Sequence, residues 1–321
     1  MLSPIAALGL SFLIGGGAAA LLTPLVKRLA IRAGALAHPG ERHIHESPTP
    51  SWGGMAIVAG FIISVAVSFL LSSAQHLPSR QFTGLILGAV LVTAMGAVDD
   101  RFHLPARFKF AGQILAAALL PIFGAGIKVV SNPLGGGWLA PSPWLAWVLT
   151  VAWVVAVTNA INLIDGIDGL AAGVSAIACI ALAAIGLLRD QAAVALLAAS
   201  LAGSAAGFLG WNFNPAKIFM GDTGAYFLGF MIGGVTVLGA FKIAASISIF
   251  IPLLVLIVPL LEAGLSTLRR YLRGQPVFAP DREHIHHRLL AMGLSQRAIA
   301  ILMYFVTAVC CIIAIWISRP Q

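Results

Sequence analysis

Charged residues are scarce in this sequence of 321 residues: only 9% are Asp, Glu, Lys or Arg, whereas 60% are hydrophobic. A soluble domain is about 25% charged, so the composition excludes an ordinary water-soluble protein. The three cysteines, Cys179, Cys310 and Cys311, all lie within apolar runs, which excludes a disulfide framework and a cysteine-ligated metal site. No Lys or Arg precedes the first apolar run, which argues against a cleaved signal peptide. The sequence also lacks a convincing internal repeat, which weakens the case for an inverted-repeat transporter.

Long apolar runs are abundant. A helix that spans a bilayer needs about 17 to 25 apolar residues. Ten stretches of this kind lie near residues 4–26, 53–72, 82–98, 108–124, 143–163, 168–188, 192–210, 224–241, 243–262 and 298–317. We therefore predict an all-α, polytopic integral membrane protein with about ten transmembrane helices, forming one domain over residues 1–321. Nine or eleven spans stay open, because only a short motif separates the fifth stretch from the sixth.

Two connecting features follow from composition. The alanine-rich run at 192–207 predicts a small-residue surface for close helix packing in lipid. The Gly/Pro-rich stretch at 128–143 predicts an external connection that contains a short hairpin.

The charged residues are distributed unevenly along this topology. Ten spans place both termini on one side and the loops after the odd-numbered spans on the other. Fourteen of the 19 basic residues lie on those odd-numbered loops, which the positive-inside rule makes cytoplasmic. Every carboxylate except Asp190 and every histidine except His76 falls on the same side. An even split is expected if helix ends merely tolerate charge, so the asymmetry predicts one site at the cytoplasmic face. The net charge of +8 requires no nucleic acid partner.

Two cytoplasmic segments in the first third of the chain carry polar motifs. The prolines and glycines of HPGERHIHESPTPSWGG (38–54) predict an ordered loop rather than a helix. A plain polar connector is an equal alternative for this segment. GAVDDRFHLPARFKF (96–110) places Asp99 and Asp100 next to each other. Neighbouring carboxylates repel, so a divalent metal or a role as proton acceptor would suit them. The alternative is a helix-end cap paired with Arg101.

NAINLIDGIDGL (159–170) follows directly after an apolar run. A carboxylate within a membrane helix costs roughly 2.5 to 3.5 kcal/mol on insertion scales, so Asp165 and Asp168 need a function that offsets this cost. If the segment is helical, Asn159, Asn162 and Asp165 share one face. Amides and carboxylates on one face suit a polar ligand and an oxygen-seeking metal, and the alternative is a packed Asn/Asp network between helices.

WNFNPAKIFMGDTGAYFLGF (211–230) carries Asp222 directly before the eighth apolar stretch. A lone carboxylate at a helix start is an N-cap in one interpretation. In the other it is a Mg²⁺ ligand, because Mg²⁺ takes only one or two protein carboxylates together with substrate phosphates. The sequence context supports both equally.

PDREHIHHRLLAMG (280–293) contains His284, His286 and His287, interleaved with arginines. A zinc site is conceivable, but the segment has no cysteine and lacks the usual helical i, i+4 spacing of histidine ligands. Contact with an anion is the better interpretation.

These five motifs, PTP…GG, DD, NAxNLxDGxDGL, NFxPAxIFMGDTG and HxHHRL, occur in this order over most of the chain. As a set they resemble the polyprenyl-phosphate N-acetylhexosamine-1-phosphate transferases of the glycosyltransferase 4 superfamily. These membrane enzymes join a sugar phosphate from a UDP-sugar to undecaprenyl phosphate. The HIHHRL form is similar to the bacterial branch that starts O-antigen, common-antigen or teichoic-acid linkage synthesis with UDP-GlcNAc. The family usually has Asp near the end of the ninth span, where this chain has Glu262, so Glu262 is given no role.

The resemblance implies a Mg²⁺-dependent transfer, with Mn²⁺ as a substitute ion, in which the lipid phosphate attacks the β-phosphorus of UDP-GlcNAc and UMP leaves. It implies that Asp222 binds Mg²⁺ and that Asp99, with Asp100 beside it, orients or deprotonates the lipid phosphate. A metal-ligand role for Asp99 stays open, because a phosphomonoester with a second pKa of about 6 is largely dianionic at pH 7. The residues expected to bind the substrates are Lys109, Asn162, Asp165, Asp168, Asn212, Phe219, Gly221, His284, His286, His287 and Arg288.

The implied setting is the bacterial inner membrane, crossed many times, with a cytoplasmic active site, inhibition by tunicamycin and a homodimer left open. Three alternatives remain. The peptidoglycan branch of the family transfers phospho-MurNAc-pentapeptide. An ion-coupled transporter would need its carboxylates near the bilayer midplane rather than gathered at one face. A CDP-alcohol phosphotransferase would show a D-G-x-x-A-R signature, which this chain lacks.

Overall fold

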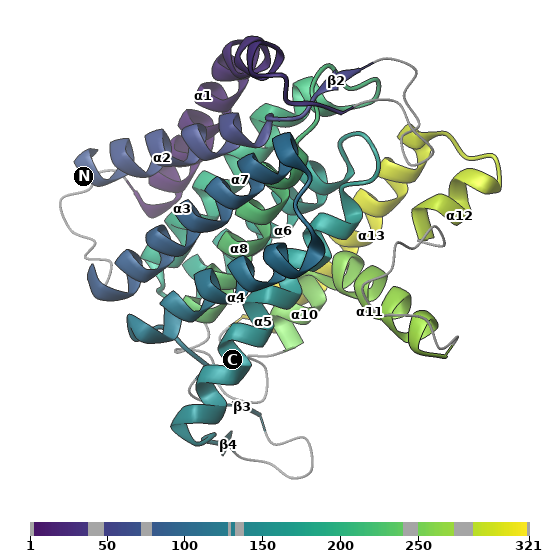
Figure 1. Ribbon diagram of the computed structural model, residues 1–321. Coiled ribbons are helices and arrows are strands. Elements are labelled where there is room, and N and C mark those ends of the chain that lie inside the picture. Colours follow the sequence, from purple (N-terminus) through teal and green to yellow (C-terminus); the bar gives the residue numbers. More distant parts are fainter. Residues whose placement is uncertain are drawn as a thin grey trace.

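The computed structural model describes residues 3–37, 48–71, 79–127, 130–131, 138–239, 250–272 and 285–319. Most of these residues form helices that run side by side as a bundle (Figure 1). The long helices are α1 (Pro4–Ala33), α2 (Gly54–Leu71), α3 (Ser79–Phe102), α4 (Ala106–Ile122), α5 (Pro143–Ile164), α6 (Leu170–Leu188), α7 (Ala192–Asn212), α8 (Gly221–Gly239), α11 (Ile257–Leu272) and α13 (Gln296–Ile317). Two short helices are α10 (Phe250–Val255) and α12 (Ile285–Ala291).

Seven of the described helices are long and apolar enough to cross a membrane: α1, α3, α5, α6, α7, α8 and α13. The chain is therefore a polytopic membrane protein. The shorter helices α2 and α4 coincide with the second and fourth predicted stretches. The ninth stretch corresponds to two helices, α10 and α11, and its first part lies outside the described residues. The total of about ten spans and the cytoplasmic face remain predictions.

Helix α8 occupies the core of the bundle. Nearly all its side chains are buried, including Tyr226, Phe227 and Phe230. It packs chiefly against α3 and α5, while α6 lies between α7 and α13. A helix that is apolar on all sides is expected in such a central position. Because α8 begins with the GDTG motif, the core places Asp222 where the ends of its neighbours meet.

Small residues let α1, α2 and α7 approach closely. A Cβ on Gly203 would lie 2.0 Å from the carbonyl oxygen of Phe12, so α7 touches the backbone of α1 there. Serine hydroxyls join the same helices: Ser64 donates to Ser200 at 2.9 Å, and Ser11 and Ser68 lie 2.7 Å apart. Close backbone approach and interhelical hydrogen bonds are the interactions that hold helices together in lipid. The small-residue surface predicted at 192–207 is confirmed.

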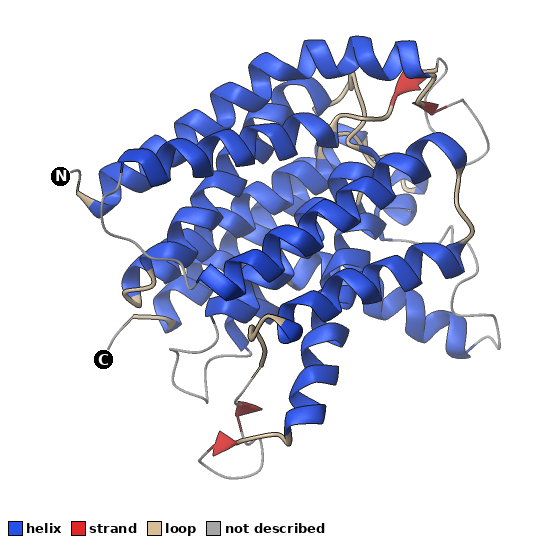
Figure 2. Cartoon of the chain, turned by 60° about the vertical axis from the view of Figure 1, so that its left-hand side comes forward, coloured by secondary structure: helices blue, strands red, loops and turns tan. Residues whose placement is uncertain are grey.

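Two short antiparallel pairs lie at opposite ends of the bundle. Strands β1 (Leu36–Ala37) and β2 (Thr49–Pro50) pair directly after α1. Strands β3 (Val130–Ser131) and β4 (Trp138–Leu139) form the hairpin predicted before α5. Figure 2 shows the start of α1 and the end of α13 on the side opposite the β1–β2 pair. An even number of crossings requires this arrangement of the two chain ends.

Candidate active site

The end of α3 lies directly against the start of α8. A Cβ on Gly96 would lie 2.6 Å from the carbonyl oxygen of Asp222, so glycine is needed for this contact. One turn later, the Asp100 carboxylate accepts hydrogen bonds from the backbone N–H groups of Asp222 and Thr223, at 2.8 and 3.1 Å, and from the Thr223 hydroxyl. These N–H groups have no partner within α8 itself. Asp100 therefore caps α8 from a neighbouring helix, as a local N-cap residue would.

Asp99, the preceding residue, lies close to Lys109 of α4 and to the Asp222 side chain of α8. The Lys109 ammonium lies 2.5 Å from Asp99 Oδ2 and 3.3 Å from Asp222 Oδ2. Asp99 is buried, and its Oδ1 accepts the backbone N–H of Leu104 at 2.7 Å. Only one oxygen of Asp99 therefore faces the cluster. One ammonium is therefore shared between two carboxyl groups.

Two neutral side chains complete this cluster. Asn162 of α5 donates its amide N–H to Asp222 Oδ1 at 2.7 Å. Tyr226 lies one turn after Asp222 on α8, and its hydroxyl is 3.3 Å from both Asp99 Oδ2 and Asp222 Oδ2. Tyr226 is absent from the residues predicted by sequence, although its i+4 spacing from Asp222 could have indicated it. Asp222 is thus contacted from α4 and α5 and from within α8.

Asp165 ends α5 and adds a further carboxylate to this region. Its N–H bonds to the carbonyl oxygen of Asn162 at 3.2 Å, and its half-buried side chain makes no hydrogen bond among the described residues. Burial raises the pKa of the Asp165 carboxyl well above its ordinary value, and the charges of Asp222, Asp100 and Asp168 raise it further. Burial and like charge both disfavour the ionised form. A cation bound nearby would relieve this effect.

Asp168 is buried and faces away from the Lys109 cluster. Its Oδ2 accepts hydrogen bonds from the Asn214 side-chain amide and the Ala216 N–H, both at 3.0 Å. The next residue, Gly169, has a φ of +76°, which favours glycine, and its N–H bonds to Asn212 Oδ1 at 3.1 Å. The second Asp of the DGxDG motif therefore fixes this loop to the turn after α7.

The loop before α2 fixes the chain that enters α8. Phe219 donates its N–H to Pro50 and accepts from Gly53, at 2.8 and 2.9 Å. Gly221 has a φ of +71°, and a Cβ there would lie 2.0 Å from the Ser51 carbonyl oxygen. The PTPSWGG and IFMGDTG motifs are thus one structural unit. Asn212 belongs to this unit as well, because its side-chain amide donates to the Ile218 carbonyl at 3.0 Å. The predicted residues Asn212, Phe219 and Gly221 therefore lie together.

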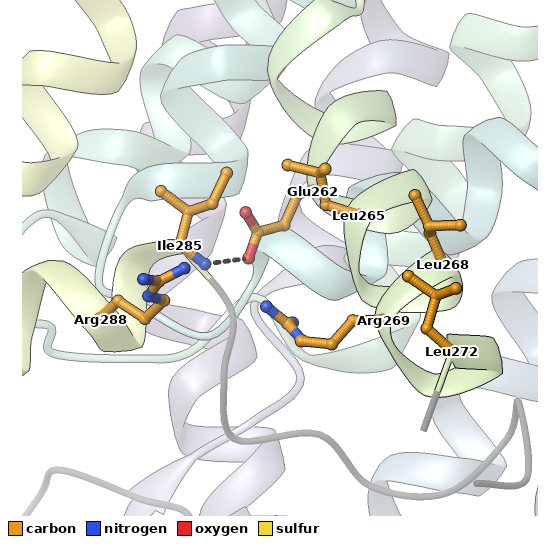
Figure 3. A pocket seen from close by; sticks show the side chains of 7 residues that line it. All are labelled: Glu262, Leu265, Leu268, Arg269, Leu272, Ile285 and Arg288. Carbon is orange, nitrogen blue, oxygen red and sulfur yellow. Dashed lines mark hydrogen bonds between the residues drawn. The ribbon is translucent and has the colours of Figure 1, made fainter. Parts of the chain in front are cut away.

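The histidine motif lies only partly within the described residues. His284 lies outside them, as do the side chains of His286 and His287 on α12, whereas Arg288 is an exposed residue of the same helix. Glu262 of α11 accepts the N–H of Ile285, the first residue of α12, at 2.8 Å. A cavity of about 320 Å³ lies between the two helices, lined by α11 leucines, Arg269 and Arg288 (Figure 3). Glu262, left without a role by the sequence, thus links α11 to the HIHHRL segment.

Within the described part of the chain, no group of three His, Cys, Asp or Glu residues is arranged to hold a metal ion. The cluster offers two carboxylates on one ammonium instead. Such a set can bind a cation that completes its coordination with ligands from a substrate. It can also place a positive charge against phosphate oxygens once Lys109 turns away from Asp99.

Asp165→Asn is expected to raise the thermal stability of the protein when no Mg²⁺ or substrate is present. Because the pKa of Asp165 is raised in the folded state, ionising its carboxyl destabilises the folded protein. This loss of stability develops as pH rises from the ordinary Asp pKa of about 3.9 toward the raised folded-state pKa. Asn removes this loss, and each kcal/mol relieved shifts Tm by about 2–4 °C. Thermal unfolding between pH 5 and 8 measures the difference. The control is Asp190→Asn, an exposed carboxylate at the turn between α6 and α7, and a lower Tm for Asp165→Asn at pH 8 contradicts the expectation.

Comparison with known proteins places this arrangement in a family. The family described as glycosyl transferase family 4 matches residues 82–240, which run from α3 to just past the end of α8. A Bacillus subtilis (strain 168) protein named probable undecaprenyl-phosphate N-acetylglucosaminyl 1-phosphate transferase is 38% identical over 286 residues, covering 89% of this chain and 78% of the relative.

Two further relatives show the breadth of the family. The decaprenyl-phosphate N-acetylglucosaminephosphotransferase of Mycobacterium tuberculosis (strain ATCC 25618 / H37Rv) is 38% identical over 306 residues, 87% of this chain and 74% of the relative. The phospho-N-acetylmuramoyl-pentapeptide-transferase of Mycolicibacterium smegmatis (strain ATCC 700084 / mc(2)155) is 30% identical over 335 residues, 91% of each chain. The chain belongs to glycosyl transferase family 4.

Proposed function

We propose that this protein transfers N-acetylglucosamine 1-phosphate from UDP-GlcNAc to undecaprenyl phosphate and releases UMP at the cytoplasmic face of a bacterial inner membrane. The observation that carries the proposal is the Lys109 ammonium held between Asp99 and Asp222, where the ends of α3, α4 and α8 meet. Relatives that are 38% identical bear the names of N-acetylglucosamine 1-phosphate transferases, and the pentapeptide transferase is more distant at 30%. The reaction brings a water-soluble nucleotide to a lipid, so its groups belong at one end of a helix bundle.

The residues present fit Mg²⁺. Asp222 offers carboxylate oxygens, the ligand type that Mg²⁺ prefers, and one protein carboxylate suffices when substrate phosphates supply further oxygens. Mn²⁺ accepts the same ligands. When bound, the ion would neutralise charge on the diphosphate and make its β-phosphorus more electrophilic. The carboxylate oxygens that face this point support a cation requirement, because they would otherwise repel a diphosphate.

Each side chain of the cluster has a role in this proposal. Asn162 holds Asp222 in one orientation through its amide. Lys109 exchanges Asp99 for a phosphate oxygen of the substrate, where its charge stabilises the transfer. Asp99 then has Oδ2 free to orient the lipid phosphate or accept its proton, while the Leu104 N–H still holds Oδ1. Asp100 supports α8 from outside the cluster, so its part in catalysis is to position Asp222.

The substrate assignment is tested with membranes or purified protein, undecaprenyl phosphate and a panel of UDP-sugars. We expect a lipid diphosphate carrying GlcNAc, release of UMP, and inhibition by tunicamycin that is competitive with UDP-GlcNAc. Product analysis by mass spectrometry identifies the sugar. Turnover of UDP-MurNAc-pentapeptide without turnover of UDP-GlcNAc would assign the protein to the peptidoglycan branch instead.

Asp222→Asn and Asp99→Asn are expected to impair different steps. Asp222→Asn removes the charge that holds the metal, so the half-saturating Mg²⁺ concentration should rise roughly 10- to 100-fold. Asp99→Asn should lower kcat roughly 100-fold with little change in the Mg²⁺ requirement. If Asp99 acts as a base, activity returns in part above the second pKa of the phosphate, about 6. The measurement is kcat against pH and Mg²⁺, with Asp190→Asn as control. An Asp99→Asn variant that responds to Mg²⁺ but not to pH would make Asp99 a metal ligand.

Lys109→Met is expected to separate metal binding from turnover. The ammonium lies against the Asp222 carboxylate that Mg²⁺ would bind, so its removal should lower the half-saturating Mg²⁺ concentration. Turnover should still fall, by roughly 100-fold, because a cation that stabilises the transferred phosphate is lost. Lys27→Met, a change of the same kind on α1, serves as the control. An unchanged kcat together with weaker Mg²⁺ binding would overturn the role given to Lys109.

A further inference from the structure

Helix α13 contacts two motif loops from outside the group of helices that carry Asp99, Lys109 and Asp222. The Tyr304 hydroxyl donates to the Gly169 carbonyl oxygen at 2.6 Å. Near the start of α13, Gln296 Oε1 accepts the N–H of Asp168 at 3.4 Å, and Arg297 donates to the Asn214 carbonyl oxygen at 2.8 Å. The loop between α5 and α6 and the turn after α7 are therefore both bound to the same helix.

The position of Tyr304 depends on a glycine in α6. A Cβ on Gly173 would lie 2.2 Å from the Tyr304 ring and 2.4 Å from its hydroxyl oxygen. The ring thus lies directly on the backbone of α6, one turn after Gly169. This contact aims the hydroxyl at the Gly169 carbonyl and leaves no space for a larger residue at 173. The hydrogen bond is therefore set by close packing between α6 and α13.

The Gly169 peptide connects this contact to the cluster. Its N–H is held by Asn212, which also donates to the Ile218 carbonyl at 3.0 Å. The chain runs from Ile218 into the GDTG motif and Asp222. Both polar groups of Gly169 are thus bonded: its carbonyl accepts from Tyr304 and from the Gly173 N–H of α6 at 2.9 Å, and its N–H donates to Asn212 at the end of α7. Asp165 lies at the other end of the same short loop, so the Tyr304 hydrogen bond is one of the contacts that fix the loop that carries Asp165.

We propose that Tyr304 is a positioning residue for the UDP-sugar: its hydroxyl holds the 165–169 loop in the orientation that the donor substrate requires. Tyr304 acts through Gly169 and does not itself contact the reacting atoms. The inference rests on the proposed function for the identity of the donor. The contacts themselves hold for any nucleotide sugar that binds between this loop and Asp222.

The test compares Tyr304→Phe with Thr307→Val in the purified full-length protein. Tyr304→Phe removes the hydroxyl and keeps the ring on Gly173. Thr307→Val removes a hydroxyl from the same helix, where Thr307 is buried and, among the described residues, bonds only to the Met303 carbonyl of its own helix at 2.7 Å. A neutral hydrogen bond contributes modestly, so Tyr304→Phe should raise KM for UDP-GlcNAc roughly three- to tenfold. We expect kcat at saturating donor to stay close to that of the wild type, and Thr307→Val to change neither constant.

Two further readouts distinguish positioning from general destabilisation. Amide hydrogen exchange of a peptide covering 165–173 should become faster in Tyr304→Phe and stay unchanged in Thr307→Val. Calorimetric binding of UMP should weaken by a similar factor as the donor. An unchanged KM, or a loss confined to kcat, overturns the proposal for Tyr304. A wild-type protein that fails to use UDP-GlcNAc contradicts the proposed function alone, because exchange and UMP binding still test Tyr304.

Discussion

The ammonium of Lys109 makes it possible for two carboxylates to face each other inside an apolar bundle. Asp99 Oδ2 and Asp222 Oδ2 share this one cation, and without it one of the two acids would have to bind a proton. A buried ion pair gains little stability overall, and removing one partner is costly because the other charge is left unpaired. Lysine suits the position, because its ammonium is a compact point charge on a flexible stem that can change partners. Lys109 therefore holds the two carboxyl groups together through a side chain that can change partners.

The bundle brings these charges together through close packing at helix ends. Gly96 lets α3 touch α8, and Gly221 lets the chain turn beneath Ser51 before α8 begins. The carboxylate of Asp100 then satisfies the N–H groups at the start of α8, so the turn that carries Asp222 is held on both sides. Each contact involves backbone atoms, which move little once the helices have packed. The orientation of Asp222 is thus decided by the fold of the bundle.

The sequence predicted the helices and the segments that would meet, because apolar length and motif composition are local properties. It could not distinguish Asp99 from Asp100. Adjacent residues on a helix point about 100° apart, and which one faces Lys109 depends on how α3 packs against α8. The cap alternative considered for this pair applies to Asp100, although its partner is the start of α8 rather than Arg101. The two alternatives considered for the NAINLIDGIDGL segment apply to different residues. Asn162 contacts Asp222 in the polar cluster, whereas Asp168 belongs to a packed Asn/Asp network.

Long-range contacts account for what the sequence missed. Tyr304 bonds to a residue 135 positions away, and no pattern near residue 304 indicates a polar partner in the loop between α5 and α6. The ninth predicted stretch corresponds to α10 and α11 because apolar length alone does not show where a helix is interrupted. The hydrogen bond from the Ile285 N–H to Glu262 likewise depends on where α12 lies in space. The motif HIHHRL does not specify that position.

The residues of the Lys109 cluster and some of the residues that support it come from different parts of the chain. Asp99, Lys109, Asn162 and Asp222 all lie within the segment that matches the family, 82–240. Asp100 and the Leu104 N–H support them from within this segment. Further contacts come from outside it, through backbone hydrogen bonds from 50–54 to the chain before α8 and side-chain hydrogen bonds from α13 to the neighbouring loops. Backbone support tolerates many substitutions, provided that glycine is kept where helices touch. Side-chain support does not, because replacing Tyr304 removes the donor itself. A chain that kept every carboxylate and lost the Tyr304 hydroxyl would thus keep the chemical groups of the cluster, while the loop between α5 and α6 would lose one of its contacts with α13.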